Sequence, residues 1–185
     1  MVLLPARDAF SVEPDLYADA KWYVLHTRSR QEKVLTKDLL AMSIPFFLPL
    51  VRKVRYYGKR KAFVELPLFP SYVFIRSSLD QAYQIDRTKR LARIIKVSDQ
   101  VLLDHELWNI QMALDKGADL AAHPYLQKGV WVEVKSGPFK GLQGVIEDRV
   151  KNDRLILQVD VLGQASSLEI DKSLLEPIDI RPDGG

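Results

Sequence analysis

The chain has 185 residues, 47% of them hydrophobic, which supplies enough apolar side chains for one domain of ordinary size or two small ones. It contains no cysteine, which excludes disulfides, thiolate zinc sites and a cysteine nucleophile, and fits a reducing compartment. The sequence shows no secretory signal and no apolar run long enough to cross a bilayer. We therefore expect a soluble, cytoplasmic protein with no membrane partner.

The net charge of +3 is unevenly distributed along the chain. Residues 21–61 contain 11 Lys and Arg against 2 acids, a net charge of +9, whereas residues 1–20 and 62–185 each carry −3. Such a concentration is typical of a surface that meets a polyanion, because Lys and Arg release counterions from a phosphate backbone. A solvated face that keeps the protein soluble explains the charge equally well.

The first elements alternate between strand and helix patterns. Residues 1–20 have no hydrophobic period and predict a flexible tail. The segment KWYVLHT (21–27) predicts a strand, and the capping-box pattern of Ser29 and Glu32 predicts a helix that runs to about Met42. YYGKRK, between two basic strand-like runs, predicts the tip of a hairpin at Gly58.

The next segments complete an α+β domain over residues 21–115. PSYVFIR (70–76) predicts a strand with Tyr72 and Phe74 on one face and Val73 and Ile75 on the other. A short helix, a strand at 92–97 and a helix capped by Asp104 follow it. Strands that bracket helices in this way favour an α+β fold.

The period changes to two in the C-terminal part. Residues 116–127 predict a linker, residues 128–178 predict a small all-β barrel of five short strands, and residues 179–185 predict a tail. The turn GPFKGLQG (137–144) does not fit a nucleotide-binding loop, since a strand and not a helix follows it. Gly141 and Gly144 are expected to provide the backbone freedom that this turn needs.

Two separate motifs resemble one family. GVWVEVKSGPFKGLQGVIEDRV resembles the KOW domain of NusG-type transcription elongation factors, and KWYVLHTRSRQEKV with PLFPSYVFI resembles their N-terminal domain. YYGKRKAFVELPLFPSYVFIR is similar to the specialised RfaH- or UpxY-type antiterminators, in which a basic, aromatic hairpin leads into a Leu-Phe-Pro element. The resemblance covers about residues 21–178 and implies an antiparallel sheet with flanking helices, followed by an SH3-like KOW barrel.

The resemblance implies a monomeric transcription elongation or antitermination factor for specific long operons. Such a factor binds elongating RNA polymerase through its N-terminal domain, on the clamp helices of the largest subunit, and reduces pausing or termination. The polymerase-binding positions that match are Trp22, Tyr23, Phe69, Pro70 and Tyr72. Strand alternation leaves open which of them belong to the core. SSLDQAYQIDRTKR replaces the His/Thr-rich element of RfaH-like factors, so a contact with the polymerase gate loop is not implied.

The resemblance also gives the basic segment a partner, the nontemplate strand or the upstream DNA. The residues expected to contact nucleic acid are His26, Arg28, Arg30, Gln31, Lys33, Arg52, Lys53, Arg55, Tyr56, Lys59, Arg60 and Lys61. Among them, His26 and Tyr56 are expected to stack on a flipped base or to hydrogen-bond with it. The alternative is that Tyr56 packs across the hairpin and that the cations only solvate its tip.

For the KOW domain, the resemblance implies binding to a small-subunit ribosomal protein or to Rho, with Phe139 at the contact. Residues 128–177 contain 7 Lys and Arg against 8 acids, which favours a protein partner over nucleic acid. Leu142 and Ile170 are expected in the core. The strand-forming composition predicts a barrel at rest, with no switch from a helical hairpin.

Two other functions compete with this interpretation. An enzyme is disfavoured because His26, His105 and His123 are scattered, without metal-ligand spacing or a catalytic signature, and we expect no cofactor and no metal. A general NusG, or an RNA- or ribosome-binding KOW module, is the other alternative. The near-neutral KOW region disfavours the module, and the basic hairpin disfavours a general NusG.

Overall fold

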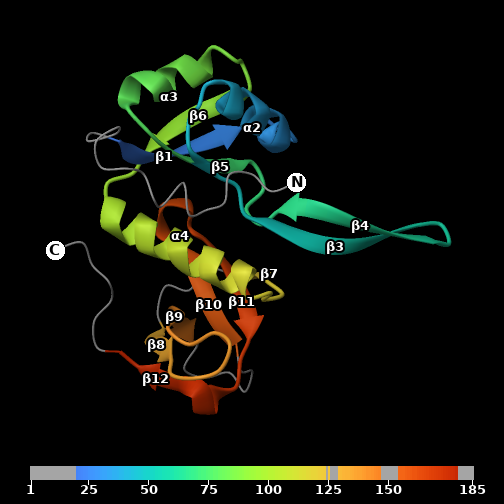
Figure 1. Ribbon diagram of the computed structural model, residues 1–185, viewed down its shortest axis with the longest axis vertical. Helices are drawn as coiled ribbons and strands as arrows, with labels where there is room; N and C mark the ends of the chain where they lie inside the picture. Colours follow the sequence, from blue (N-terminus) through green and yellow to red (C-terminus); the bar gives the residue numbers. More distant parts are fainter. Residues whose placement is uncertain (1–19, 124, 126–128, 147–153, 179–185) are drawn as a thin grey trace. The chain divides into compact units, whose positions relative to one another are not determined.

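The computed structural model describes residues 20–123, 125, 129–146 and 154–178 (Figure 1). The predicted tails lie outside this range, except for residue 20. The chain forms two compact units, divided after Gln100. This division comes earlier than the boundary at 115 that the sequence analysis expects, because most of the last helix groups with the C-terminal unit.

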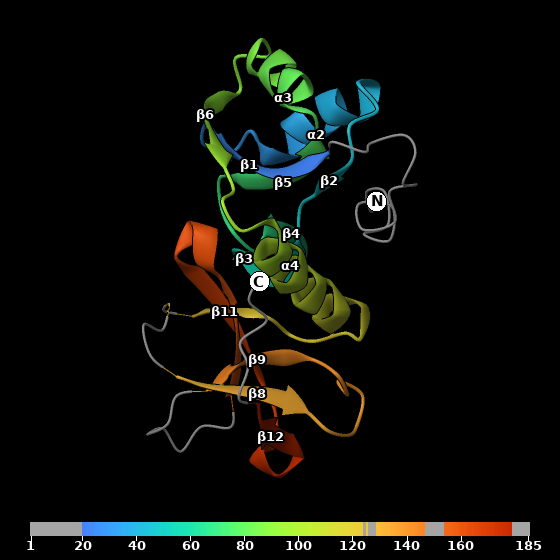
Figure 2. The ribbon, with the colours of Figure 1, turned by 90° about the vertical axis from the view of Figure 1, so that its left-hand side faces the viewer.

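The first unit is built on a four-stranded antiparallel sheet with the strand order β2-β5-β1-β6. Its strands are β1 (Lys21–Thr27), β2 (Phe46–Phe47), β5 (Tyr72–Ser77) and β6 (Leu91–Lys96). Helices α2 (Glu32–Ala41) and α3 (Leu79–Asp86) lie on one side of this sheet (Figure 2). The expected antiparallel sheet with helices is therefore confirmed.

The core of this unit lies between the sheet and the two helices. Leu35 and Leu39 of α2 pack with Ala82 and Ile85 of α3 against the sheet. The sheet contributes alternate side chains, as the pleat requires: Tyr23, Leu25, Phe46, Val73 and Ile75. The face that carries Val73 and Ile75 packs in this core, which settles the question that strand alternation left open.

The two helices begin differently. Helix α2 starts at Glu32, and its N-cap Gln31 makes no side-chain capping bond, so the predicted Ser29 capping box is wrong. Helix α3 has a complete capping box, in which Ser78 Oγ accepts from the Gln81 amide and the Gln81 side chain accepts from the Ser78 amide. Glu32 is engaged elsewhere, as described below.

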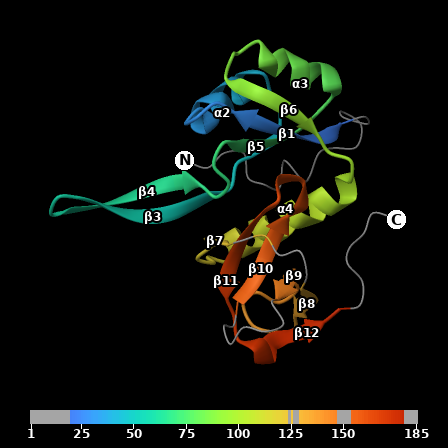
Figure 3. The ribbon, with the colours of Figure 1, turned by 180° about the vertical axis from the view of Figure 1, so that it is seen from behind.

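The predicted hairpin forms a separate two-stranded sheet that extends away from the four-stranded one (Figure 3). It consists of β3 (Leu50–Tyr57) and β4 (Arg60–Pro67). The register runs from Leu50 opposite Pro67 to Tyr57 opposite Arg60. Gly58 at the tip has a φ of 61°, a left-handed conformation that glycine adopts without strain.

The second unit contains a six-stranded antiparallel sheet with the order β12-β8-β9-β10-β11-β7. Its strands are β7 (Ala121–His123), β8 (Val130–Val134), β9 (Gln143–Ile146), β10 (Arg154–Val159), β11 (Gln164–Glu169) and β12 (Leu175–Pro177). This confirms the all-β class of the C-terminal region. Strand β7 falls within the expected linker, where it pairs with β11.

Helix α4 (Gln100–Asp115) begins at the last residue of the first unit. The Gln100 side chain accepts from the Trp22 amide at 2.6 Å and donates to the Trp22 carbonyl at 3.0 Å. Further along, buried Asn109 accepts from the Gln143 amide at 3.0 Å, and buried Glu106 accepts from the Asp160 amide at 3.1 Å. Because the helix starts at Gln100, the prediction that Asp104 caps it is wrong.

Candidate functional site

The side of the four-stranded sheet opposite α2 and α3 carries a row of aromatic rings. The register places Trp22 opposite Arg76, Phe74 between Val24 and Phe47, and His26 opposite Tyr72. We call this the aromatic face; its rings are Trp22, His26, Phe47, Phe69, Tyr72 and Phe74. The side chains of Tyr72 and Phe74 thus lie on one face, as strand alternation predicts.

These rings contact one another along the face. Phe69 meets Phe74 edge to face, with centroids 6.3 Å apart, and His26 stacks on Tyr72 at 5.0 Å. The Arg76 guanidinium lies 6.0 Å from the centre of the Trp22 ring. Such contacts fix the ring positions, since each edge-to-face or stacked pair adds about 0.5–1.5 kcal/mol beyond its buried area.

The predicted polymerase-binding residues divide into three groups. Trp22 and Phe69 belong to the aromatic face but are buried, each 2% exposed. Pro70 is exposed and Tyr72 half-buried, so they present surface beside the buried rings. Tyr23 is different, because its side chain points to the opposite side and packs with Leu25 in the core under the helices.

The turn between β4 and β5, which carries Phe69, Pro70 and Tyr72, is held by a buried carboxylate. The Glu32 side chain is 7% exposed and accepts a hydrogen bond of 2.7 Å from the Ser71 amide. The Ser71 carbonyl accepts from the Thr27 amide at 2.8 Å. Ser71 has a φ of 68°, which is unusual for a residue with a side chain, so these bonds hold a strained turn. Sequence reasoning assigned Glu32 to a capping box and missed this role.

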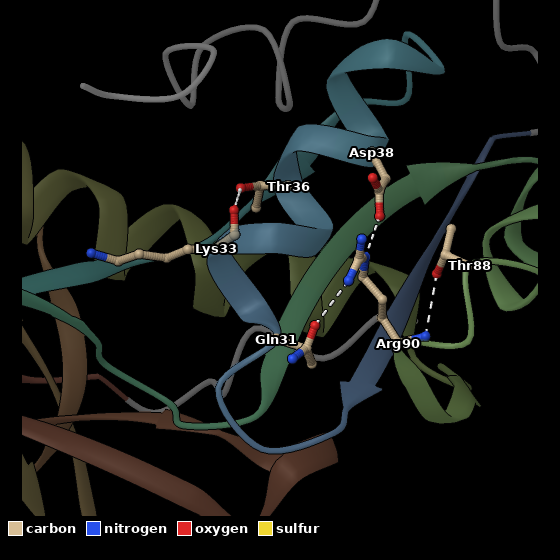
Figure 4. Close-up of polar contacts among 6 residues, drawn as sticks. All are labelled: Gln31, Lys33, Thr36, Asp38, Thr88 and Arg90. Carbon is tan, nitrogen blue, oxygen red and sulfur yellow. Dashed lines mark hydrogen bonds and ion pairs between the residues drawn. The ribbon is translucent and has the colours of Figure 1, made fainter.

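Arg90, which directly precedes β6, links that strand to α2 and to its N-cap residue. Its guanidinium donates to Asp38 at 2.5 Å and to the Gln31 side chain at 3.0 Å (Figure 4). Its carbonyl accepts from the Arg28 amide at 2.8 Å. Gln31, which was expected to contact nucleic acid, is therefore occupied by an internal bond.

The basic residues around the start of α2 differ in whether they make internal contacts. The Lys33 ammonium donates to the Glu65 carbonyl at 2.7 Å and so links α2 to the hairpin. Arg28 and Arg30 are exposed. His26 is half-buried against Tyr72, so one side of its ring is already covered.

Directly opposite residues of the hairpin share a face, which divides its side chains into two sets. The Phe63 face carries Arg52, Val54, Tyr56, Lys61, Phe63 and Glu65, and the Tyr57 face carries Lys53, Arg55, Tyr57, Arg60, Ala62 and Val64. Tyr56 is 70% exposed, Tyr57 62% and Phe63 60%. Tyr56 is therefore not packed against the rest of the hairpin. Phe63 is a second exposed ring on the same face, and sequence reasoning missed it although it lies between Lys61 and Glu65 on that face.

The cations of the hairpin are uncompensated. Residues 50–67 contain 6 Lys and Arg against a single acid, Glu65. Within the described residues none of the six cations forms an ion pair. Arg52 and Lys61 instead lie 5.3 and 5.2 Å from the centre of the Phe63 ring. The hairpin is thus a basic, aromatic surface open to solvent.

In the second unit, Phe139 lies within the turn that joins β8 to β9. It is half-buried and lines a hollow of about 340 Å³ together with Ala121, Arg154 and Leu168. Gly141 has a φ of 86°, and Gly144 has no room for a side chain, because a Cβ there would lie 2.6 Å from the Ile156 carbonyl oxygen. Leu142 and Ile170 are buried, as expected for core residues.

The described part of the chain contains no group of three or more His, Asp or Glu side chains that would hold a metal ion. Among the helices in the described ranges, none combines the length and the apolar character that a membrane span requires.

An antiparallel sheet with helices on one side, followed by an all-β unit, is the fold that the NusG resemblance implies. Residues 20–111 match the model of the family described as "Transcription termination factor nusG". The chain therefore carries a NusG-family domain, and the resemblance of its N-terminal motifs to that domain is confirmed, whereas the similarity to specialised antiterminators stays a prediction. The match extends into α4, although most of that helix groups with the second unit.

The chain is similar to proteins named NusG over most of its length. The "Transcription termination/antitermination protein NusG" of Rickettsia typhi is 28% identical over 81% of this chain and 86% of its own length. The proteins with that name from Helicobacter pylori J99 and Lactococcus lactis are 26% and 25% identical, over 85% and 86% of this chain and 98% and 94% of their own lengths. The crystal structure of the MjSpt4:Spt5 complex, conformation B, is 14% identical over 88% of this chain and 99% of its own, with a TM-score of 0.26.

Proposed function

We propose that this protein is a transcription elongation and antitermination factor that binds RNA polymerase through the aromatic face of its first unit. The observation that carries the proposal is the strained turn that Glu32 holds at the edge of this face. The turn presents Pro70 and Tyr72 beside buried Phe69. A small aromatic surface supported by a packed layer is typical of the centre of a protein interface.

The individual residues contribute in different ways. Tyr72 and Pro70 make the direct contact with the clamp helices of the largest subunit, and Phe69 supports them from the buried layer. Trp22 lies farther along the sheet, opposite Arg76. Tyr23 has no direct role, because its side chain lies in the core. The family match over residues 20–111 supports the assignment of this contact to the first unit.

The basic segment completes the complex by contacting DNA that leaves the polymerase. Arg28, Arg30 and the hairpin cations are exposed, and phosphates are the groups that uncompensated Lys and Arg bind best. The similarity of this hairpin to those of specialised antiterminators supports a role at particular operons. The second unit, through Phe139 and the hollow beside it, contacts a ribosomal protein or Rho.

The proposal is tested by transcription with purified RNA polymerase past pause and terminator sites, with and without the full chain. We expect faster passage with the chain, and we expect Tyr72→Ala to abolish it. If Tyr72 is a main contact, its loss weakens polymerase binding by at least about 30-fold, which corresponds to roughly 2 kcal/mol.

The matched control is Tyr83→Ala, which removes an exposed tyrosine from α3, on the other side of the sheet. This variant is expected to bind and to act like the unchanged chain. Equal losses in both variants, or a chain that neither binds polymerase nor changes its passage, would overturn the proposal.

A further inference from the structure

We infer that the Phe63 face of the hairpin binds RNA whose bases are unpaired. The inference departs from the DNA contact proposed above for one part of the hairpin only: it assigns the Phe63 face to RNA and leaves Arg28, Arg30 and the Tyr57 face to DNA.

Exposed rings on neighbouring strands identify the kind of ligand. Phe63 pairs with Val54 and Tyr56 with Lys61, so the two rings are diagonal neighbours on the same face. Side chains in this position lie roughly 7 Å apart. Unpaired bases stack on such rings, whereas a duplex keeps its base faces covered. The rings therefore select a single strand.

The cations around Phe63 complement the phosphates of that strand. Arg52 and Lys61 lie over the Phe63 ring, 5.3 and 5.2 Å from its centre. A base that stacks on Phe63 displaces these cations from the ring, and its phosphates are then next to two positive charges that no carboxylate in the described residues neutralises. This charge complementarity, together with the rings, favours a nucleic acid over a protein partner.

Glu65 favours RNA over DNA. It is the only acid in the hairpin, and it is exposed opposite Arg52 on the Phe63 face. A carboxylate repels phosphates, but it accepts a hydrogen bond from a ribose 2′-hydroxyl, which DNA lacks. A ribose next to the stacked base is therefore the partner that makes this position favourable.

The Tyr57 face provides an internal comparison. It has three cations, Lys53, Arg55 and Arg60, but only one ring and no acid. It offers phosphate contacts without a pair of stacking rings. Tyr57 is 62% exposed, close to the exposure of Tyr56, so its replacement is a matched control.

The test measures the binding of the full chain, by fluorescence anisotropy, to an end-labelled unstructured RNA, to single-stranded DNA of the corresponding sequence and to the RNA duplex. We expect the tightest binding to single-stranded RNA. Tyr56→Ala and Phe63→Leu should each weaken it about 5- to 100-fold, the range for loss of one stacked base. Phe63→Trp keeps a ring and should retain binding, as should Tyr57→Ala.

Glu65→Gln tests the choice of RNA. It should lower the ratio of RNA affinity to DNA affinity, because it replaces the acceptor of the 2′-hydroxyl with a weaker one, whereas the lost charge repels the phosphates of both ligands. The inference is overturned by equal losses in the Tyr56 and Tyr57 variants, by DNA or duplex binding as tight as that of RNA, or by an unchanged RNA-to-DNA ratio in Glu65→Gln.

The assay contains no polymerase, so its outcome is separate from that of the proposed function. Faster elongation without RNA binding would overturn this inference and leave the proposed function standing. RNA binding through the Phe63 face without any effect on elongation would do the reverse. The substituted residues are all exposed, and circular dichroism before each titration checks that every variant is folded.

Discussion

At the scale of single residues, Glu32 shows how a buried charge can serve a surface. Glu32 is the first residue of α2, but its carboxylate does not cap the helix as the sequence predicts. It accepts a hydrogen bond from the Ser71 amide, in a turn of unfavourable backbone geometry. The burial of a carboxylate is unfavourable unless hydrogen bonds to its oxygens offset the lost hydration. The residue is therefore better explained by the turn than by the helix.

We expect Glu32→Ala to destabilise the chain by about 1–3 kcal/mol, because it leaves the Ser71 amide without its acceptor. Glu32→Gln keeps an oxygen acceptor and should cost less. Chemical denaturation of both variants measures the loss. Glu65→Ala, which removes an exposed carboxylate, is the control, and a loss of similar size there would contradict the assignment.

His105 on α4 gives a prediction for pH dependence. Burial holds the pKa of His105 below its ordinary value of 6.5, against the opposing effects of the nearby Gln143 side chain and of the charge on Asp104. Its Nε2 atom is buried without a hydrogen-bond partner among the residues that the structure describes. The folded chain therefore binds this proton less readily than the unfolded chain, and protonation favours unfolding.

The stability that neutral His105 contributes is fully present above pH 6.5. The free energy of unfolding should fall as the pH drops from 6.5 through the lower folded pKa of His105. His105→Gln, which cannot titrate, should make the unfolding free energy less sensitive to pH in that window. Denaturation at several pH values tests this, and an NMR titration of the ring measures the pKa directly. A folded pKa at or above 6.5 would contradict the prediction.

Asp171 acts in a lower pH window. The Ser173 amide donates to its carboxylate at 2.8 Å and holds the pKa of Asp171 below its ordinary value of 3.8. Its stabilising effect is present above that value and is lost as the pH falls through the folded pKa. Acid effects of the two residues can therefore be separated by pH.

At the scale of elements, β9 and β10 illustrate how closely two strands can approach. Gly144 of β9 lies against the backbone and side chains of β10, with Ile156 and Leu155 where its Cβ would be. Sequence reasoning assigned this glycine to backbone freedom in the turn. The structure shows that Gly141 serves the turn, whereas Gly144 serves the close contact.

Gly144→Ala should therefore destabilise the second unit by at least about 1–3 kcal/mol, since the added methyl group overlaps a backbone oxygen that cannot move alone. Gly163→Ala is the matched control, because Gly163 has a φ of 60° but open space around its Cβ. That variant should lose only about 1–2 kcal/mol, the cost of the left-handed conformation. Thermal unfolding of both compares the two effects, and a smaller loss at Gly144 would refute the overlap.

Strand faces could be predicted from the sequence, whereas helix starts could not. Strand alternation placed Tyr72 and Phe74 correctly, because a pleated strand leaves no other choice. The helix starts were wrong because caps depend on distant partners. Glu32 accepts a hydrogen bond from Ser71, and Gln100 of α4 binds the backbone of Trp22, in a strand far away in sequence. No local pattern carries that information.

At the scale of the whole molecule, the two-part organisation and the fold class follow from composition and period alone. The hydrophobic period changes after the helical segment, and the glycine turns predict short strands. The division after Gln100 could not be predicted, because it depends on bonds from Glu106 and Asn109 of α4 to distant backbone amides. The same reason explains β7, a strand inside an expected linker.

The candidate site was predictable to different degrees. The positive charge of residues 21–61 identified the hairpin as a basic surface, and the structure shows its cations unpaired among the described residues. The aromatic face required the strand register, which brings Phe47 and Phe74 beside Phe69. Tyr23 was assigned to the wrong side of its strand, since a match of adjacent aromatic residues does not distinguish the two faces.

The hairpin has a consequence for how copies of the protein behave toward one another. In the described part of the chain β3 and β4 pair only with each other, so each has an outer edge with backbone groups to which another strand can add. Natural proteins protect such edges with charge, and six Lys and Arg on one ribbon repel a second copy of it. Any polyanion that neutralises these cations also removes that repulsion. Self-association of this protein should therefore depend on which polyanions share its solution.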